Sequence, residues 1–411
     1  MFLSSSNYMF SLGFVLIFGF LFGYLFKKIK LPSLVGMLLV GIIFGPSVLK
    51  VIGVNEDITY ISQFLRQLAL IIILTRSGLN LDLESLKKIG RPAILMCFLP
   101  ATFEILGISL FGHLLFNITW IESLLLGSVL AAVSPAVVSP RMIKLIEEGY
   151  GNNHNVPKLI LAGSSMDDIY VIILFYAFLG ILENNSFDIL SIIKIPTSII
   201  FGILLGIIAG YILSIIFKKI KLNISSSILI TLSISCLLIA LDEIVITKYI
   251  NISWLGISSL LSIMVLSITL LFKNKEKANE LSKGYNHCWT IFEVILFVLV
   301  GAKLNISSIN SSIFMGILVI IIGLIFRSIG VLFCLIKTEL TFKERLFCVI
   351  AYIPKATVQA SIGCIAFDMG LDPNGIILEI SIISILLTAS IGALLIDILA
   401  PKLLEKKQII W

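Results

Sequence analysis

Charged residues are scarce in this sequence, because lysine, arginine, aspartate and glutamate together make up only 13% of its 411 residues. Soluble domains usually carry about 25% charged residues, and the hydrophobic share here is correspondingly high at 58%. Apolar runs recur from end to end, each near the roughly 20 residues that a helix needs to cross a bilayer. The scarcity of charge therefore excludes an ordinary soluble protein and predicts a helical protein that crosses the membrane many times.

Histidine is also scarce, with three widely separated residues, and the six cysteines form no CxxC pair. A glycine-rich phosphate-binding loop is absent as well. These absences argue against a metal-dependent enzyme, a redox pair and a protein driven by ATP, and we predict no cofactor. The net charge of +6 does not indicate nucleic-acid binding, because in a membrane protein the positions of basic residues matter more than their sum.

Thirteen apolar segments are long enough to be membrane-spanning helices. Their predicted limits are 8–26, 31–50, 58–76, 92–116, 120–145, 157–182, 190–217, 223–241, 249–272, 287–305, 311–336, 345–367 and 375–399. The longest break between them is the polar stretch KNKEKANELSKGYNH (273–287), which we expect to be a cytoplasmic loop. Lysine and arginine concentrate in every second connection. Because basic loops stay in the cytoplasm, this pattern predicts an outside N-terminus and a cytoplasmic C-terminus.

The odd number of spans suggests two six-helix halves joined by the seventh. The first half would start outside and the second inside, so the halves would be inverted repeats, which is a common plan among transporters. The predicted fold is therefore an all-α polytopic membrane protein with two inverted six-helix repeats. A bacterial plasma (inner) membrane is the expected location.

Two spans are interrupted at corresponding positions in the halves. The fifth contains AVSPAVVSP (132–140), with Pro135 and Pro140, and the twelfth contains IPKATVQASIG (353–363), with Pro354. Proline removes a backbone donor, and unpaired carbonyls at membrane depth are tolerated only where protein encloses them or water reaches them. Matching breaks therefore predict a transport site where the ends of half-helices meet.

Five of the charged residues within predicted spans are candidates for the transport site: Glu104, Asp167, Asp168, Arg327 and Lys355. A central aspartate, lysine or arginine costs about 2.5–3.5 kcal/mol on insertion scales, so these groups should face the interior and pair there. The fourth and eleventh spans are equivalent in the two halves, and we therefore expect Glu104 and Arg327 to approach each other. On this hypothesis, swapping the two charges should recover expression lost in either single variant.

Asp167 and Asp168 are adjacent, so on a helix they point about 100° apart and do not share a face. One can face a cavity while the other faces a neighbouring helix. Burial and mutual repulsion favour the protonated form of a carboxylate, and a small hard cation prefers oxygen ligands. A carboxylate that holds either a proton or a cation, at a site that can face either side of the membrane, is by itself an exchange mechanism.

Several further motifs occur in a fixed order between about residue 60 and residue 370. They are ILTRSGLNLDLESLKK (73–88), the Glu104 segment, SVLAAVSPAVVSPRM (128–142), LILAGSSMDDIYVI (159–172), VGAKLNI (300–306), FRSIG (326–330) and FKERLFCVIAYIPKATVQASIG (342–363). Together they resemble the monovalent cation/proton antiporter superfamily, and within it the NHA-type sodium/proton exchangers. The ordered set covers most of the chain.

The resemblance implies a homodimer in which a mobile core moves like an elevator against a dimerisation domain. The core would comprise helices 4–6 and 11–13, residues 91–182 and 307–400, with the fifth and twelfth helices crossing at their breaks. The dimerisation (scaffold) domain would comprise helices 1–3 and 8–10, residues 1–90 and 223–306. The seventh helix, 190–217, would link the halves, and 401–411 would be a cytoplasmic tail.

The resemblance also assigns roles by matching position. Asp168 would be the essential carrier of cation and proton, with Asp167 as its auxiliary partner. Ser134 and Thr357, one in each break, would add oxygens for Na⁺ or Li⁺.

Arg327 would occupy the position where electrogenic relatives often place a lysine, with Glu104 as its partner. Lys355 would balance helix-end charge at the crossing. An arginine does not release its proton, which favours one proton per cycle and electroneutral exchange. The double aspartate, however, is often associated with electrogenic relatives.

The preferred prediction is a secondary antiporter in the lipid bilayer that exchanges Na⁺ or Li⁺ for H⁺. K⁺/H⁺ exchange is an alternative, because the radius of the ion cannot be read from the sequence. A sodium-coupled symporter of organic anions on a similar fold would have a roomier cavity and no lone essential aspartate. A sensory or ligand-gated protein would use the fold without turnover.

Overall fold

A computed structural model describes residues 8–52, 56–81, 90–183, 189–241, 256–305 and 309–406. In these ranges all regular structure is helical, apart from one isolated bridge between Tyr150 and Lys406. Several sequence-based expectations fall outside them in part: the ninth span at 249–255, the motifs at 82–88 and at 306, the tail at 407–411, and stretches of the domains predicted at 1–90, 223–306 and 307–400.

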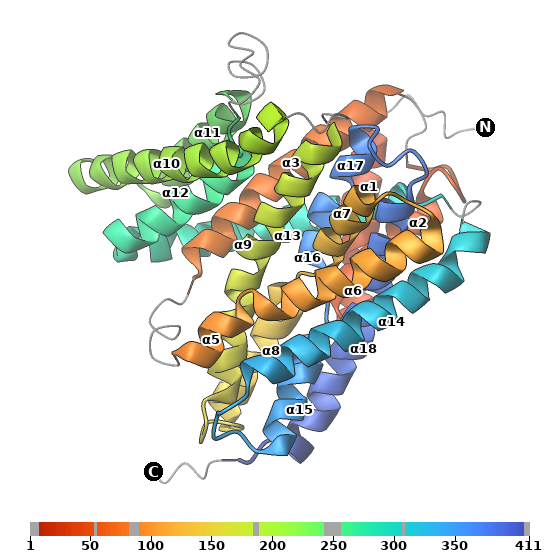
Figure 1. Cartoon of the computed structure of the whole chain (residues 1–411). Helices are drawn as coiled ribbons and strands as arrows, with labels where there is room; N and C mark the ends of the chain where they lie inside the picture. Colours follow the sequence, from red (N-terminus) through yellow and green to blue (C-terminus); the bar gives the residue numbers. More distant parts are fainter. Residues whose placement is uncertain are drawn as a thin grey trace. The chain divides into compact units, whose positions relative to one another are not determined.

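The helices follow one another along the chain as shown in Figure 1. They are α1 (Tyr8–Lys28), α2 (Ser33–Phe44), α3 (Glu56–Leu79), α5 (Arg91–Met96), α6 (Leu99–Phe116), α7 (Trp120–Leu130), α8 (Pro135–Glu148), α9 (Val156–Glu183), α10 (Ile189–Lys219), α11 (Ile224–Ala240), α12 (Ser259–Lys273), α13 (Lys275–Ala302), α14 (Ile309–Cys334), α15 (Phe342–Ala351), α16 (Thr357–Ile362), α17 (Ile365–Asp368) and α18 (Ile376–Leu403).

Most predicted spans coincide with one helix or with consecutive helices. The spans predicted at 8–26, 157–182 and 311–336 correspond to α1, α9 and α14. The fourth span is divided into α5 and α6, and the fifth into α7 and α8. The twelfth is divided into α15, α16 and α17, so both spans that contain proline breaks are interrupted.

The prediction of a polar loop over residues 273–287 was wrong, because α13 begins at Lys275 and runs through this stretch. Lysine, glutamate, alanine and leucine are good helix formers even when the segment is polar. Asn274 caps the helix, with its side-chain oxygen accepting from the Lys277 N–H at 3.2 Å. Ala278, Leu281 and Tyr285 recur at helical spacing and are fully buried. One packed face therefore stabilises a helix whose other face is polar.

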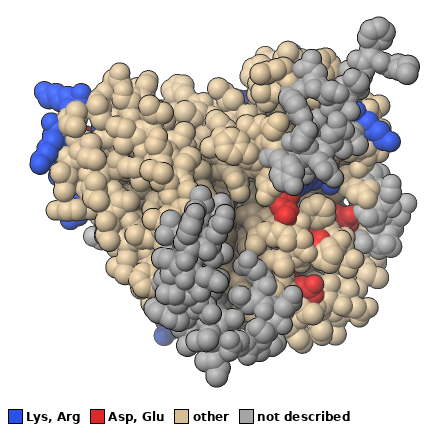
Figure 2. Space-filling model, turned by 90° about the horizontal axis from the view of Figure 1, so that it is seen from above, with Lys and Arg blue, Asp and Glu red and all other residues tan. Residues whose placement is uncertain are grey.

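Eight segments among the described residues are helical, long and apolar enough to cross a membrane, and α2, α11 and α12 are shorter apolar helices. Most of the described atoms visible in Figure 2 belong to uncharged residues, with a few Lys, Arg, Asp and Glu side chains among them. The chain is thus an all-helical polytopic membrane protein. The count of thirteen spans and the inverted repeats stay predictions.

The chain divides into two compact units. Unit 1 comprises Met1–Gln63, Asp82–Ile172 and Val294–Trp411, and unit 2 comprises Phe64–Leu81 and Ile173–Glu293. Within unit 2, α10 packs along α12, and Gly206 and Gly210 allow the two backbones to approach closely. All seven residues predicted for the transport site lie in unit 1.

Within unit 1, α6 lies beside α14, as Figure 1 shows. Their close approach depends on Gly107 and Gly323, where an added Cβ would overlap a side chain of the other helix. Glu104 lies three residues before Gly107, and Arg327 lies four residues after Gly323. The packing of these two helices therefore brings the two charges to a shared interface.

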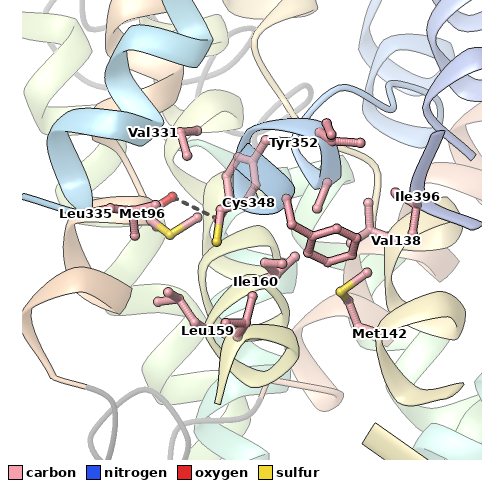
Figure 3. Packing of buried hydrophobic residues seen from close by; sticks show 14 of the residues in the cluster. Met96, Val138, Met142, Leu159, Ile160, Val331, Leu335, Cys348, Tyr352 and Ile396 are labelled. Atoms are coloured by element: carbon pink, nitrogen blue, oxygen red, sulfur yellow. Dashed lines mark hydrogen bonds between the residues drawn. The ribbon is translucent and has the colours of Figure 1, made fainter. Parts of the chain in front are cut away.

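A cluster of buried apolar side chains in unit 1 joins α5, α8, α9, α14, α15 and α18 (Figure 3). Met142, Leu159, Phe347 and Ile396 are among its members. Tyr352 also belongs to the cluster, and its hydroxyl donates to the carbonyl oxygen of Met96 at 3.4 Å. The cluster thereby fixes the position of the Tyr352 ring, which lies beside the guanidinium of Arg327.

Candidate functional site

Two interruptions of helical structure meet in unit 1. Residues 131–134 separate α7 from α8, and residues 352–356 separate α15 from α16. The N–H of Ser134 in the first break donates to the carbonyl oxygen of Pro354 in the second at 2.8 Å. Each break leaves backbone groups that a continuous helix would have paired, and the side chains around the crossing take their place.

Two cationic side chains cover the carbonyl end of α7. Lys355 Nζ donates to the carbonyl oxygen of Leu130 at 2.6 Å, and Arg327 Nη1 donates to that of Ala131. Carbonyl groups at the C-terminal end of a helix carry partial negative charge, so a cation stabilises them. The structure thus places Lys355 at the end of α7, and its expected role of balancing helix-end charge stays a prediction.

The peptide between Ala132 and Val133 donates its N–H to a carboxylate. The Val133 N–H donates to Asp167 Oδ2 at 2.9 Å. The same oxygen accepts from Arg327 Nη2 at 2.7 Å. Asp167, carried by α9, is fully buried, and it is therefore held from one side by the broken backbone and from the other by a guanidinium.

Arg327 joins two carboxylates. Its Nη1 lies 2.7 Å from Glu104 Oε2, and its Nη2 lies 2.7 Å from Asp167 Oδ2. The second oxygen of Glu104, Oε1, lies 2.7 Å from Lys355 Nζ. All four side chains are buried, and their formal charges cancel, two against two. Buried charges persist when they are paired and hydrogen-bonded in this way.

The structure brings Glu104 and Arg327 together, as the symmetry of the spans suggested, but each has a second partner. The second partners change the expected result of swapping the two charges. An arginine at position 104 would face Lys355, and a glutamate at position 327 would face Asp167. Like charges in contact are unfavourable when buried, so the swapped chain is not expected to recover expression.

Asp168 lies outside this network. Asp168 is only 6% exposed, and its Oδ1 is buried without a hydrogen-bond partner. Within the described part of the chain, no ion pair reaches its carboxylate. Oδ1 of Asp167 and Oγ of Ser134 are likewise buried and unpartnered. Thr357 opens α16 and is buried at the second break. The site thus holds a carboxylate with no fixed counter-charge and further unpartnered oxygens.

Two residues at the site were missed by the sequence reasoning. Gln359 in α16 donates from Nε2 to the carbonyl oxygens of Leu130 and Ala132, at 3.3 and 2.8 Å. The ring of Tyr352 lies 5.2 Å from the guanidinium carbon of Arg327, within cation–π range. The sequence holds a signal for Gln359, because an amide within a membrane span needs hydrogen-bond partners, but an uncharged side chain stands out less than an intramembrane charge.

Gly163, one turn before Asp167, makes room for Tyr352. A Cβ at this position would overlap the tyrosine hydroxyl. Gly163→Ala should therefore destabilise the protein by about 1–3 kcal/mol, the usual cost of overpacking. Thermal melting of the detergent-solubilised protein measures the effect.

The control for this prediction is Gly13→Ala in α1, where an added methyl meets nothing within 4 Å. Tyr352→Phe removes the hydroxyl, so the double variant Gly163→Ala/Tyr352→Phe should regain part of the stability that Gly163→Ala loses. The rest stays lost because the added methyl also lies 2.8 Å from Met96 Cβ. An equal loss in both backgrounds would show that the tyrosine is not the obstacle.

A second charged contact of unit 1 joins the loop before α9 to the start of α15. His154 Nδ1 lies 2.9 Å from Glu344 Oε1 and 3.0 Å from Oε2. The hydrogen bond to Glu344 raises the pKa of His154, and Glu339 and Glu405 act in the same direction. Burial disfavours the charged form of Glu344, but hydrogen bonds from His154 and Thr341 outweigh it and lower the pKa of Glu344.

This pair should make stability depend on pH. A raised histidine pKa contributes stability that is fully present below its unfolded value of about 6.5 and is lost as pH rises through the folded value. A lowered glutamate pKa contributes stability above its unfolded value of about 4.3, lost as pH falls. His154→Gln should therefore lower the melting temperature most near pH 5.5 and little near pH 9. His287→Gln, whose ring contacts the Lys283 carbonyl of its own helix, is the control; a loss independent of pH contradicts the prediction.

Known proteins are similar to this chain in sequence and in fold. The family model described as sodium/hydrogen exchanger, transmembrane, matches residues 14–401. Sodium/hydrogen exchanger 9B2 of Homo sapiens is 32% identical over 389 residues, which cover 92% of this chain and 71% of that protein. Sodium/hydrogen exchanger 9B1 of Homo sapiens is 33% identical over 396 residues, which cover 92% of this chain and 73% of that protein.

A solved structure has a similar fold. The sodium proton antiporter MjNhaP1 from Methanocaldococcus jannaschii, determined at pH 8, superposes with a TM-score of 0.80 and 22% sequence identity, covering 95% of this chain and 97% of that one. The match of the family model to nearly the whole sequence, and the human relatives that align over most of it, lead to one conclusion: the chain belongs to the sodium/hydrogen exchanger family.

Proposed function

We propose that this chain is a secondary-active antiporter that exchanges Na⁺ or Li⁺ for H⁺, with the cation and the proton competing for the carboxylate of Asp168. The family supports cation/proton antiport. The observation that carries the assignment to Asp168 is its isolation. Glu104, Asp167, Arg327 and Lys355 pair with one another, whereas Asp168 has no ion-pair partner among the described residues and its Oδ1 is unpartnered.

Charge balance supports the exchange of one proton for one monovalent cation. The two carboxylates and two cations of the network cancel, and Asp168 adds a single negative charge. One proton or one Na⁺ neutralises that charge, whereas both together leave an excess. Arg327 keeps its proton throughout and stays bound to two carboxylates. Exchange is therefore electroneutral in this proposal, despite the double aspartate.

The neighbouring oxygens complete the proposed cation site. Asp167 is anchored through Oδ2, which leaves its Oδ1 available. Ser134 Oγ is unpartnered in the first break, and Thr357 lies at the second. Hard cations favour carboxylate, hydroxyl and carbonyl oxygens. Asp168 would supply the charge, and the other three residues would replace part of the hydration shell of the ion.

Transport requires the site to face each side of the membrane in turn. We propose an elevator motion in which residues 91–182 and 307–400 move against a dimerisation domain made of 1–90 and 223–306, within a homodimer. The support is the likeness of the fold to MjNhaP1 and the contact between the two breaks at the site. The N-terminus outside and the C-terminus in the cytoplasm complete this proposal.

The test is proton flux in proteoliposomes containing the purified chain, driven in turn by gradients of Na⁺, Li⁺ and K⁺. We expect flux with Na⁺ and Li⁺, at rates that an imposed membrane potential does not change. Flux with K⁺ alone would replace the proposal by K⁺/H⁺ exchange. A rate that follows the potential would exclude electroneutral exchange, and no flux with any of the three cations would reject cation/proton antiport.

A further inference from the structure

Among the described side chains that donate to the end of α7, Gln359 is uncharged, whereas Lys355 and Arg327 are cations. Gln359 is the third residue of α16 and is 1% exposed. Its Nε2 donates to Ala132 O at 2.8 Å and to Leu130 O at 3.3 Å. Its amide therefore connects α16 to the last carbonyl of α7 and to one carbonyl of the first break.

The contact with Ala132 bears on the aspartates because of one shared peptide unit. The carbonyl of Ala132 and the N–H of Val133 belong to the same peptide, which is planar and rigid. Gln359 holds the carbonyl end of this plane, and Asp167 Oδ2 accepts from its N–H end at 2.9 Å. A rotation of the plane that breaks one contact must disturb the other, so the orientation of Asp167 depends on Gln359.

An uncharged donor also suits the charge balance of the site. Lys355 and Arg327 already cover Leu130 and Ala131, and their charges are matched by Glu104 and Asp167. A third cation at position 359 would offset the charge of Asp168 and would remove the need for a transported ion. An amide satisfies the carbonyl of Ala132 without adding charge.

We propose that Gln359 is a positioning residue for cation binding: it holds the peptide between Ala132 and Val133, which in turn holds Asp167 so that its free oxygen is available beside Asp168. This inference rests on the proposed function. Gln359 does not itself carry the proton or the charge of the cation. Its loss should weaken cation binding while the carrier and the exchange step persist.

The test is sodium-dependent proton flux in proteoliposomes, measured for the full chain over a range of Na⁺ concentrations at fixed pH. Gln359→Met keeps the length of the side chain and removes both donors. We expect the KM for Na⁺ to rise about tenfold, with the maximal rate per folded protein within about a factor of two of wild type. Gln359→Asn keeps an amide that is one methylene too short for both carbonyls, and its KM should lie between.

The matched control is Ser361→Ala on the same short helix, because the Ser361 hydroxyl bonds to the Thr357 carbonyl of its own helix. It should leave KM unchanged. A Gln359→Met protein with less folded material or a lower maximal rate, but with the KM of wild type, would overturn the positioning role. If Gln359→Met does not fold, Gln359→Asn decides by the same criterion. Failure of the wild type to exchange any cation would instead reject the proposed function.

Discussion

Asp168→Asn should reduce sodium-dependent proton flux to the level of protein-free liposomes while the protein remains folded. Asparagine keeps the size of the side chain and a carbonyl oxygen, but it neither takes up a proton nor carries the negative charge that attracts a cation. Because the network of Glu104, Asp167, Arg327 and Lys355 is already neutral, no other group at the site can replace that charge. Flux with Na⁺ and Li⁺ should be lost together.

The fold of this variant should be as stable as wild type or more stable. An unpaired buried carboxylate costs free energy, and the amide removes that cost. Asp397→Asn is the matched control in the same unit, since Asp397 is exposed and pairs with Arg141 at 3.1 Å. It should transport normally. Sodium-dependent flux in Asp168→Asn near the wild-type rate would remove Asp168 from the mechanism.

Arg327→Met should be the most destabilising substitution at the site. It removes the partner of Glu104, a partner of Asp167 and the donor to the Ala131 carbonyl. Breaking a buried ion pair from one side typically costs about 3–5 kcal/mol, because the remaining charge is left uncompensated. Thermal melting of the detergent-solubilised protein should show this loss, accompanied by loss of exchange.

A double variant separates the effect of lost charge on stability from the effect of lost packing. In Glu104→Gln/Arg327→Met, one carboxylate and one cation are removed together, so Lys355 and Asp167 balance again. The double variant should therefore be more stable than Arg327→Met alone, although it still lacks the guanidinium contacts. If both proteins melt at the same temperature, the charge of Glu104 is not coupled to Arg327.

Apolar run length and intramembrane charge predicted much of the fold and most of the candidate site. Hydropathy located the helices because lipid requires continuous, internally paired helical backbone. The prolines within two of the apolar runs indicated the breaks between α7 and α8 and between α15 and α16. Intramembrane charges stood out because each is costly unless it is paired. Glu104, Asp167, Arg327 and Lys355 prove to be mutual partners in the structure.

Other features depend on tertiary packing that a linear pattern does not contain. The polar start of α13 is helical because Ala278, Leu281 and Tyr285 are buried on one face. Hydropathy averaged along this segment does not show that face. Arg327 binds two carboxylates, Glu104 and Asp167, because of how α6, α9 and α14 pack. Gln359 and the Ala132–Val133 peptide become connected only when the two breaks cross.

The competition at Asp168 is tested most directly by proton release when Na⁺ is added to the purified protein in weakly buffered detergent solution, at a pH where the site is protonated. Each folded chain should release a single proton with a saturable dependence on Na⁺, and Asp168→Asn should release none. Sodium binding without proton release, or equal release from Asp168→Asn, would contradict the account.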